Sequence, residues 1–97
     1  MRKFKVTLRG RNLLLKLEQV AKHGVLIVRF VEAPDEILAG RTAMENFRCE
    51  PKGRALADSI LNALDDPHVF EIESVEELES LSQVKNLSPG LAFYPET

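Results

Sequence analysis

The stretch KFKVTLRGRNLLLKL, residues 3–17, decides the fold because apolar and polar residues alternate along it. Phe4, Val6 and Leu8 share one side of the chain, while charged and hydroxyl side chains share the other. A period of two with one apolar side is typical of a strand that is buried on one face. We therefore predict that the chain begins in a β-sheet.

Glycine interrupts the strand pattern twice. Gly10 is the first interruption and, because Gly and Asn tolerate positive φ, we predict a tight turn at residues 10–12 and a second strand at 13–17. A further turn ends at Gly24, before the β-branched stretch VLIVRFVEA at 25–33. Three strands joined by short turns predict an antiparallel meander.

Two helices are predicted after the meander. Pro34 suits a first helical position. The apolar stripe that should pack on the sheet consists of Ile37, Gly40, Ala43, Met44 and Phe47. Pro51 and Gly53 then break the pattern. The stripe of a second helix consists of Leu56, Ile60, Ala63 and Leu64. The alternative is one long helix bent at Pro51.

The C-terminal third returns to strand patterns. Residues 69–73 alternate and predict a strand, and residues 91–94 predict a short last strand. Residues 74–81 remain open between strand and helix, since Ser74 and Glu77 match a capping box. We predict one α+β domain over residues 1–97. Its antiparallel sheet contains the meander and one or two C-terminal strands, with both helices on one face.

Composition narrows the class of protein. Ninety-seven residues with 44% hydrophobic and 29% charged side chains predict one globular domain. The single cysteine, Cys49, excludes an internal disulfide and fits a reducing compartment. No apolar run approaches the roughly 18–20 residues that span a bilayer, and the N-terminus lacks the pattern of a secretory signal. We expect a cytoplasmic protein that does not bind membranes.

Charge is divided unevenly along the chain. Residues 1–30 hold eight basic residues and one acid, whereas residues 65–97 hold eight acids and one base. One interpretation is a nucleic-acid surface on the N-terminal hairpin, made of Arg2, Lys3, Lys5, Arg9 and Arg11. The other is internal pairing, with Lys3 and Lys5 opposite Glu71 and Glu73. We favour pairing, because no aromatic residue alternates on the basic side and the pI is about 5.7.

Catalytic chemistry finds little support. Phosphate-binding loops and nucleophile motifs are absent. A catalytic cysteine needs a base close in space, and His23 or His68 could supply one for Cys49, but an inert, partly buried thiol is the favoured interpretation. The segment DDPH at 65–68 offers two carboxylates and an imidazole, but it has no second ligand cluster. We predict no catalytic residue, no metal ligand and no cofactor.

One apolar feature indicates a partner. The stretch VLIVRFV at 25–31 is apolar on both sides, and LAFYP at 91–95 adds two aromatic residues. A sheet with helices on one face leaves the other face open, unless the C-terminal segment covers it. We predict that a second copy or another protein binds through Ile27, Arg29, Val31, Phe93 and Tyr94. The expected function is a small binding or regulatory module, and nucleic-acid binding by the basic hairpin is the alternative.

Three segments also resemble known sequences. They are VLIVRFVEAPDE at 25–36, DDPHVFEIESVEEL at 65–78 and GLAFYPE at 90–96. In these the chain resembles a group of short bacterial α+β proteins of unassigned function. The segment between 37 and 60 departs from the Glu- and Ala-rich helix of that group. The resemblance implies an α+β fold and implies no activity, substrate or site.

Overall fold

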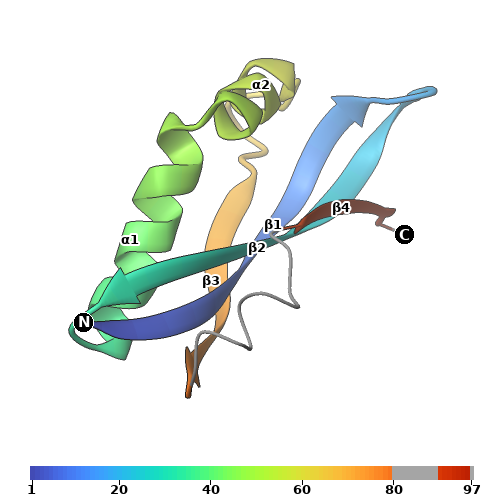
Figure 1. Cartoon of the computed structure of the whole chain (residues 1–97). Helices are drawn as coiled ribbons and strands as arrows, with labels where there is room; N and C mark the ends of the chain where they lie inside the picture. The colour runs from blue at the N-terminus through green and yellow to red at the C-terminus, as the bar shows by residue number, and fades with distance from the viewer. Residues whose placement is uncertain (80–89, 97) are drawn as a thin grey trace.

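The protein is described by a computed structural model that covers residues 1–79 and 90–96. Its elements are, in chain order, β1 (Arg2–Lys16), β2 (Val20–Ala33), α1 (Glu36–Cys49), α2 (Pro51–Ser59), β3 (Val69–Leu78) and β4 (Gly90–Pro95). The strands form one antiparallel sheet in the order β3-β1-β2-β4, and both helices lie on one face of it (Figure 1). The predicted α+β class is confirmed.

The predicted turn at residues 10–12 is wrong, and so is the turn that was predicted to end at Gly24. β1 runs through the first position and β2 through the second, so the meander is one long hairpin that reverses at residues 17–19. The pairing of β1 with β2 instead shifts register between Gly10 and Leu13. This bulge adds one residue to β1, and Asn12 within it has a φ of 59°. The added residue keeps Leu13 and Leu15 on the same buried face as Leu8.

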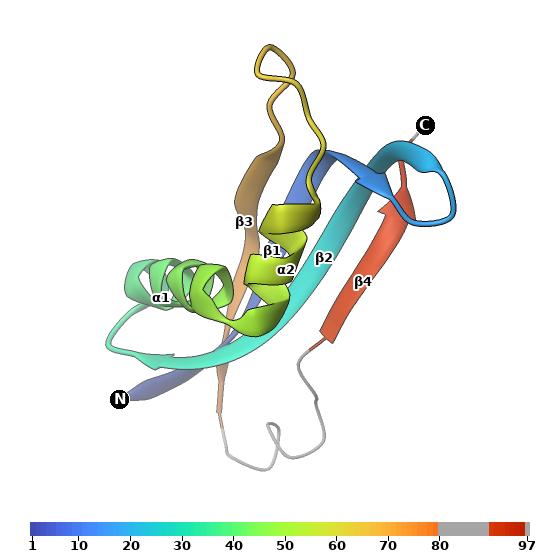
Figure 2. The same cartoon turned by 90° about the horizontal axis from the view of Figure 1, so that it is seen from above.

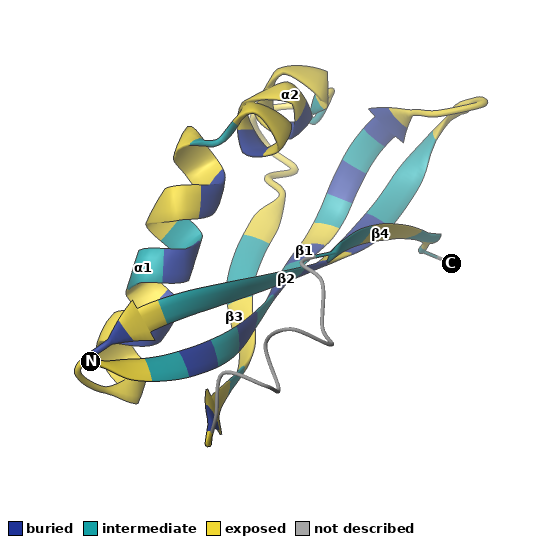
Figure 3. Cartoon of the chain, in the orientation of Figure 1, coloured by how far each residue is buried: buried dark blue, intermediate teal, exposed yellow. Residues whose placement is uncertain are grey.

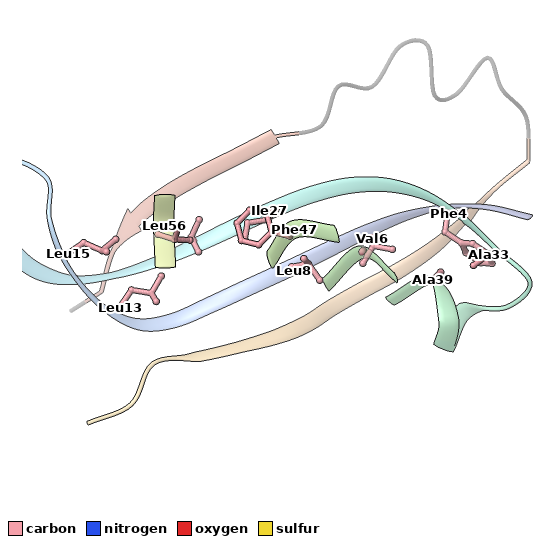
Figure 4. Close-up of a cluster of buried hydrophobic side chains, with 12 residues drawn as sticks. Phe4, Val6, Leu8, Leu13, Leu15, Ile27, Ala33, Ala39, Phe47 and Leu56 are labelled. Atoms are coloured by element: carbon pink, nitrogen blue, oxygen red, sulfur yellow. The ribbon is translucent and has the colours of Figure 1, made fainter. Parts of the chain in front are cut away.

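The helix-facing side of β1 and β2 supplies most of the core. Phe4, Val6 and Leu8 are fully buried, and the buried faces of both helices pack above them (Figures 3 and 4). Burying each large apolar side chain contributes about 1.5–3 kcal/mol. The helices are therefore held mainly by the sheet below them.

The helix stripes differ in part from the prediction. On α1 the residues Gly40, Ala43 and Phe47 are buried as expected, but Ile37 is 77% exposed and Ala39 takes its place in the core. Asp35 caps this helix by accepting a hydrogen bond from the Leu38 amide at 2.8 Å, which fixes where the first turn begins.

The second helix is shorter than predicted. It ends at Ser59, and Leu64 is fully exposed. The chain beyond it bonds to the free edge of β1 instead. The Leu61 amide donates to the Leu14 carbonyl at 2.8 Å, and the Leu14 amide donates to Asn62 Oδ1 at 2.8 Å. These bonds satisfy strand-edge groups that a longer helix would leave without partners.

The acidic C-terminal strand lies beside the basic N-terminal strand. β3 continues to Leu78, so residues 74–78 of the segment left open by the sequence are strand, and residues 80–81 lie outside the described residues. The pairing of β1 with β3 shifts register between Thr7 and Leu8.

No helix among the described residues is long and apolar enough to cross a membrane.

Candidate functional site

The basic side of β1 is paired with acids. Four of the five residues predicted to bind nucleic acid contact carboxylates, in the pairs Arg2–Glu77, Lys3–Glu32, Arg9–Glu73 and Arg11–Glu71. Their N–O distances are 2.7, 2.8, 3.7 and 3.1 Å respectively. The fifth residue, Lys5, makes no ion pair within residues 1–79 and 90–96. Internal pairing therefore occupies most of the basic charge of β1.

The register changes the predicted partners. Lys3 lies opposite Leu78, and Lys5 lies opposite Glu76, because β3 is displaced along β1 from the alignment expected from the sequence. Glu71 and Glu73 meet arginines near the bulge instead of the two lysines. The two charged strands lie side by side, as the favoured interpretation of internal pairing requires, but the individual pairs differ from those expected.

These pairs predict an acid-sensitive stability. Hydrogen bonds from Lys3, Lys22 and Arg2 lower the pKa values of Glu32, Asp66 and Glu77, respectively. In the unfolded chain these carboxyls titrate near about pH 4. Their stabilising contribution is therefore complete above about pH 4 and is lost as the pH falls through the lower folded-state pKa values. In urea titrations we expect a midpoint that changes little from about pH 7 to 5 and falls from about pH 4 to 2.

A pair of variants tests the source of that acid sensitivity. Glu77→Gln should flatten the fall in the urea midpoint below about pH 4, because it removes one carboxyl whose pKa the fold lowers. Glu45→Gln is the matched control, since Glu45 is an exposed glutamate of α1 without an ion pair among the described residues. Equal acid slopes for Glu77→Gln and the unaltered protein would show that the Arg2–Glu77 pair does not contribute.

The residues predicted to form a protein interface do not share one surface. Ile27 is buried in the core, and Arg29 and Val31 lie on the same helix-covered face. Tyr94 belongs to the opposite face, because the register places it beside Gly24. Phe93 is 39% exposed on the helix side.

Arg29 makes its contacts inside the fold. Its guanidinium pairs with Glu50 at the junction of α1 and α2, donates to the Gly90 carbonyl at 3.1 Å, and lies 5.4 Å from the centre of the Phe47 ring. Only 14% of its side chain is exposed. One cation thereby ties the two helices to β2 and to the start of β4.

The face of the sheet without helices is mixed in character. Leu26, Val28 and Phe30 form an apolar row along β2, beside the charged row of β1. The Tyr94 ring occupies the space that a side chain at Gly24 would fill, and its hydroxyl accepts a hydrogen bond from Arg9 Nε at 3.0 Å. Arg9 and Tyr94 thus cover part of this face from within the chain.

A groove opens on the other face, between α2, the hairpin end of β1 and β4. It has a volume of about 390 Å³, and Leu15 and Leu56 at its base belong to one end of the core (Figure 4). It is lined by Leu15, Lys16, Leu17, Lys52, Ala55, Leu56, Ser59, Leu91 and Phe93. Ligand pockets typically measure about 300–1,000 Å³ and are mainly apolar. In size and lining the groove, which we call the α2–β4 groove, resembles such sites.

Local sequence patterns place these side chains in the groove. The residues from α2 lie at positions 52, 55, 56 and 59, a spacing that puts them on one helix face. Leu91 and Phe93 are two residues apart on β4, so both lie on one side of that strand. Leu15 lies near the end of β1, and Leu17 follows the last residue of that strand. Three continuous elements therefore turn apolar sides toward one groove.

The charges at the groove are positive. Lys16 and Lys52 line it, and no acidic residue does among the described residues. Within the part of the chain that the structure describes, neither lysine has an ion-pair partner. This differs from β1, where most basic side chains are already paired.

A second hollow lies at the bulge of β1, and four of its six lining residues are polar or charged. It measures about 510 Å³ and is lined by Arg11, Asn12, Lys22, Pro67, Val69 and Glu96. Its charged side chains make ion pairs and hydrogen bonds within the chain. Lys22 pairs with Asp66 and donates to Asn12 Oδ1 at 2.6 Å, and Glu96 accepts from the Asn12 amide at 2.8 Å. This network holds the bulge in place.

The remaining chemical candidates are scattered. Cys49 is exposed at the end of α1, so the expectation of a partly buried thiol is wrong; the final helical turn presents it to solvent. Asp66 is bonded to Lys22 and Asn12, while His68 packs edge-on against Phe70 at 5.6 Å. These contacts do not assemble a nucleophile with a base.

Together the fold and the groove define an α+β protein with a four-stranded antiparallel sheet and, on its helix side, an apolar groove that no described residue covers. Comparison of the chain with protein-family models, curated proteins and solved structures found no match. The resemblance to short bacterial proteins therefore stays a prediction.

Sequence reasoning missed the α2–β4 groove. The alternating leucines at 13–17 and the apolar pair on β4 were visible as strand signals. Their proximity depends on β4 pairing with β2, and on α2 ending at Ser59 rather than at Leu64. Neither the strand order nor the end of the helix follows from local periodicity.

Proposed function

We propose that this chain is a cytoplasmic, non-catalytic protein-interaction module, and that a segment of a partner protein binds in the α2–β4 groove. The observation that carries the proposal is the apolar lining of that groove by three elements on the helix side of the sheet. Phe93 and Leu17 are exposed there to 39% and 53%, respectively. A partner that covers them gains the free energy of removing apolar surface from water.

Other features support binding rather than chemistry. The histidines and Cys49 lie outside the groove, and the described residues that line it include no acid that would act as a general base. An exposed free thiol also fits a reducing compartment.

The nucleic-acid alternative has less support. Most of the basic side chains of β1 contact carboxylates, so phosphates would have to compete with existing ion pairs. Phosphate contacts also make affinity fall steeply with salt. We expect mixed short RNA and DNA to show no salt-sensitive binding between about 50 and 200 mM salt.

A variant that fills the groove tests the proposed function. Ala55 lines the groove and is exposed, so Ala55→Trp should occupy the site while leaving the core intact. Peptides selected from a random library on the unaltered protein should lose affinity for this variant by about tenfold or more. Affinity is measured by fluorescence anisotropy, and thermal unfolding confirms that the variant is folded.

The matched control is Arg54→Trp, which places the same side chain on an exposed position of α2 that does not line the groove. It should bind the selected peptides as the unaltered protein does. Failure to select any peptide, or equal binding to Ala55→Trp, would contradict the proposed function.

A further inference from the structure

In the part of the chain that the structure describes, the helix layer over the sheet ends beside the α2–β4 groove. Figure 2 shows α1 and α2 over β3, β1 and β2, while β4 lies to one side, and within residues 1–79 and 90–96 no helix lies over it. Its helix-facing residues, Leu91 and Phe93, therefore line the groove from below. In α+β folds an apolar sheet face is covered by a layer of helices. The position next to α2, which no described residue fills, therefore has the surroundings of a helix site.

The two lysines at the groove favour an occupant that carries negative charge. Six basic residues outside the groove, on β1 and β2, already have carboxylate partners: Arg2, Lys3, Arg9, Arg11, Lys22 and Arg29. Lys16 approaches the groove from β1 and Lys52 from α2, and both remain without an ion-pair partner in the described chain. Carboxylates on the occupant would complement them, and cations would be repelled.

An extended peptide fits less well than a helix. A strand would add to the outer edge of β4, but that strand has only six residues and ends at Pro95, which has no amide to donate. The groove instead lies above the strands and runs beside α2, where an amphipathic helix inserts side chains at i, i+3 or i+4, and i+7.

We propose that the occupant of the α2–β4 groove is an acidic amphipathic helix of a partner protein. The inference rests on the proposed function, since it specifies the segment that the module binds. The apolar stripe of the helix contacts Leu17, Leu56 and Phe93, and glutamates or aspartates beside the stripe pair with Lys16 and Lys52.

Two designed peptides of about 16 residues, about 24 Å long as helices, test the proposal. They carry the same leucine stripe, and their polar positions are all glutamate in one and all lysine in the other. By fluorescence anisotropy the glutamate peptide should bind at least about tenfold more tightly, and its affinity should fall as salt rises. A glutamate peptide of scrambled order, without a stripe, should not bind at about 100 μM.

Charge reversal supplies the decisive comparison. The double variant Lys16→Glu/Lys52→Glu should reverse the preference between the two peptides. The control Arg41→Glu/Arg54→Glu makes the same change of net charge at exposed helix positions outside the groove, and it should keep the preference.

The outcomes separate this inference from the proposed function. Equal binding of both peptides, abolished by Ala55→Trp, would overturn the acidic helix and leave the groove as a binding site. Selected peptides that bind the groove but prefer an extended conformation by circular dichroism would overturn the helix. A dimer in sedimentation equilibrium that Phe93→Ser dissociates would show that a second copy is the occupant and would overturn the proposal.

Discussion

Gly53→Ala is expected to lower the free energy of unfolding by about 3 kcal/mol or more. A β-carbon at position 53 would overlap the backbone carbonyl of Phe47, where α2 crosses the end of α1. Alanine normally favours a helix over glycine by about 1 kcal/mol. The clash outweighs this gain, because a backbone carbonyl in a packed helix cannot rotate away as a side chain can. Urea unfolding monitored by circular dichroism measures the loss.

Gly40→Ala is the matched control for that experiment. It makes the same substitution within a helix, but the added β-carbon would lie 2.8 Å from Ile72 Cδ1, the flexible end of a side chain that is 46% exposed. We expect its stability to remain within about 1 kcal/mol of the unaltered protein. A loss in Gly53→Ala no larger than that in Gly40→Ala would contradict the close crossing of the helices.

Phe47→Ala is expected to lower the free energy of unfolding by about 3–4 kcal/mol. Phe47 is 3% exposed, its ring centre is 6.4 Å from that of Phe70 on β3, and Arg29 lies over it. The substitution removes core volume and also removes the cation–π contact between the Phe47 ring and the largely buried Arg29 guanidinium. It should therefore cost more than the loss of contact area alone.

The controls for Phe47 separate volume from position. Phe47→Leu should cost about 1 kcal/mol, because most of the apolar volume is kept. Ile37→Ala removes a large side chain that is 77% exposed on the same helix, and it should change stability by less than about 0.5 kcal/mol. A small effect for Phe47→Ala would indicate that α1 is not anchored to the sheet at this residue.

The fold class could be predicted because its signals are local. Alternation around Phe4, Val6 and Leu8 indicated a half-buried strand, and the spacing of Gly40, Ala43 and Phe47 indicated a helix face. Gly10 misled the prediction, because glycine is also common where a strand bulges. Asn12, two residues after Gly10, has a positive φ and forms part of this bulge rather than of a hairpin turn.

The candidate site could not be predicted in the same way, because it depends on which elements become neighbours. Ile27 and Arg29 were expected at an interface because β2 is apolar on both sides, yet the helices cover them. Phe93 was also expected there, and it does line the groove. No sequence pattern singled out Lys16 and Lys52. They became candidates only because the fold places both at one groove, without ion-pair partners in the described chain.

The most direct test of the account is an NMR titration of the isotope-labelled protein with the glutamate-bearing amphipathic peptide. The account predicts amide and methyl shift changes concentrated at the α2–β4 groove, at Leu15, Leu17, Ala55, Leu91 and Phe93. Shift changes confined to the helix-free face, at Leu26, Val28 and Phe30, would contradict the account. So would a protein saturated with peptide whose groove signals do not move.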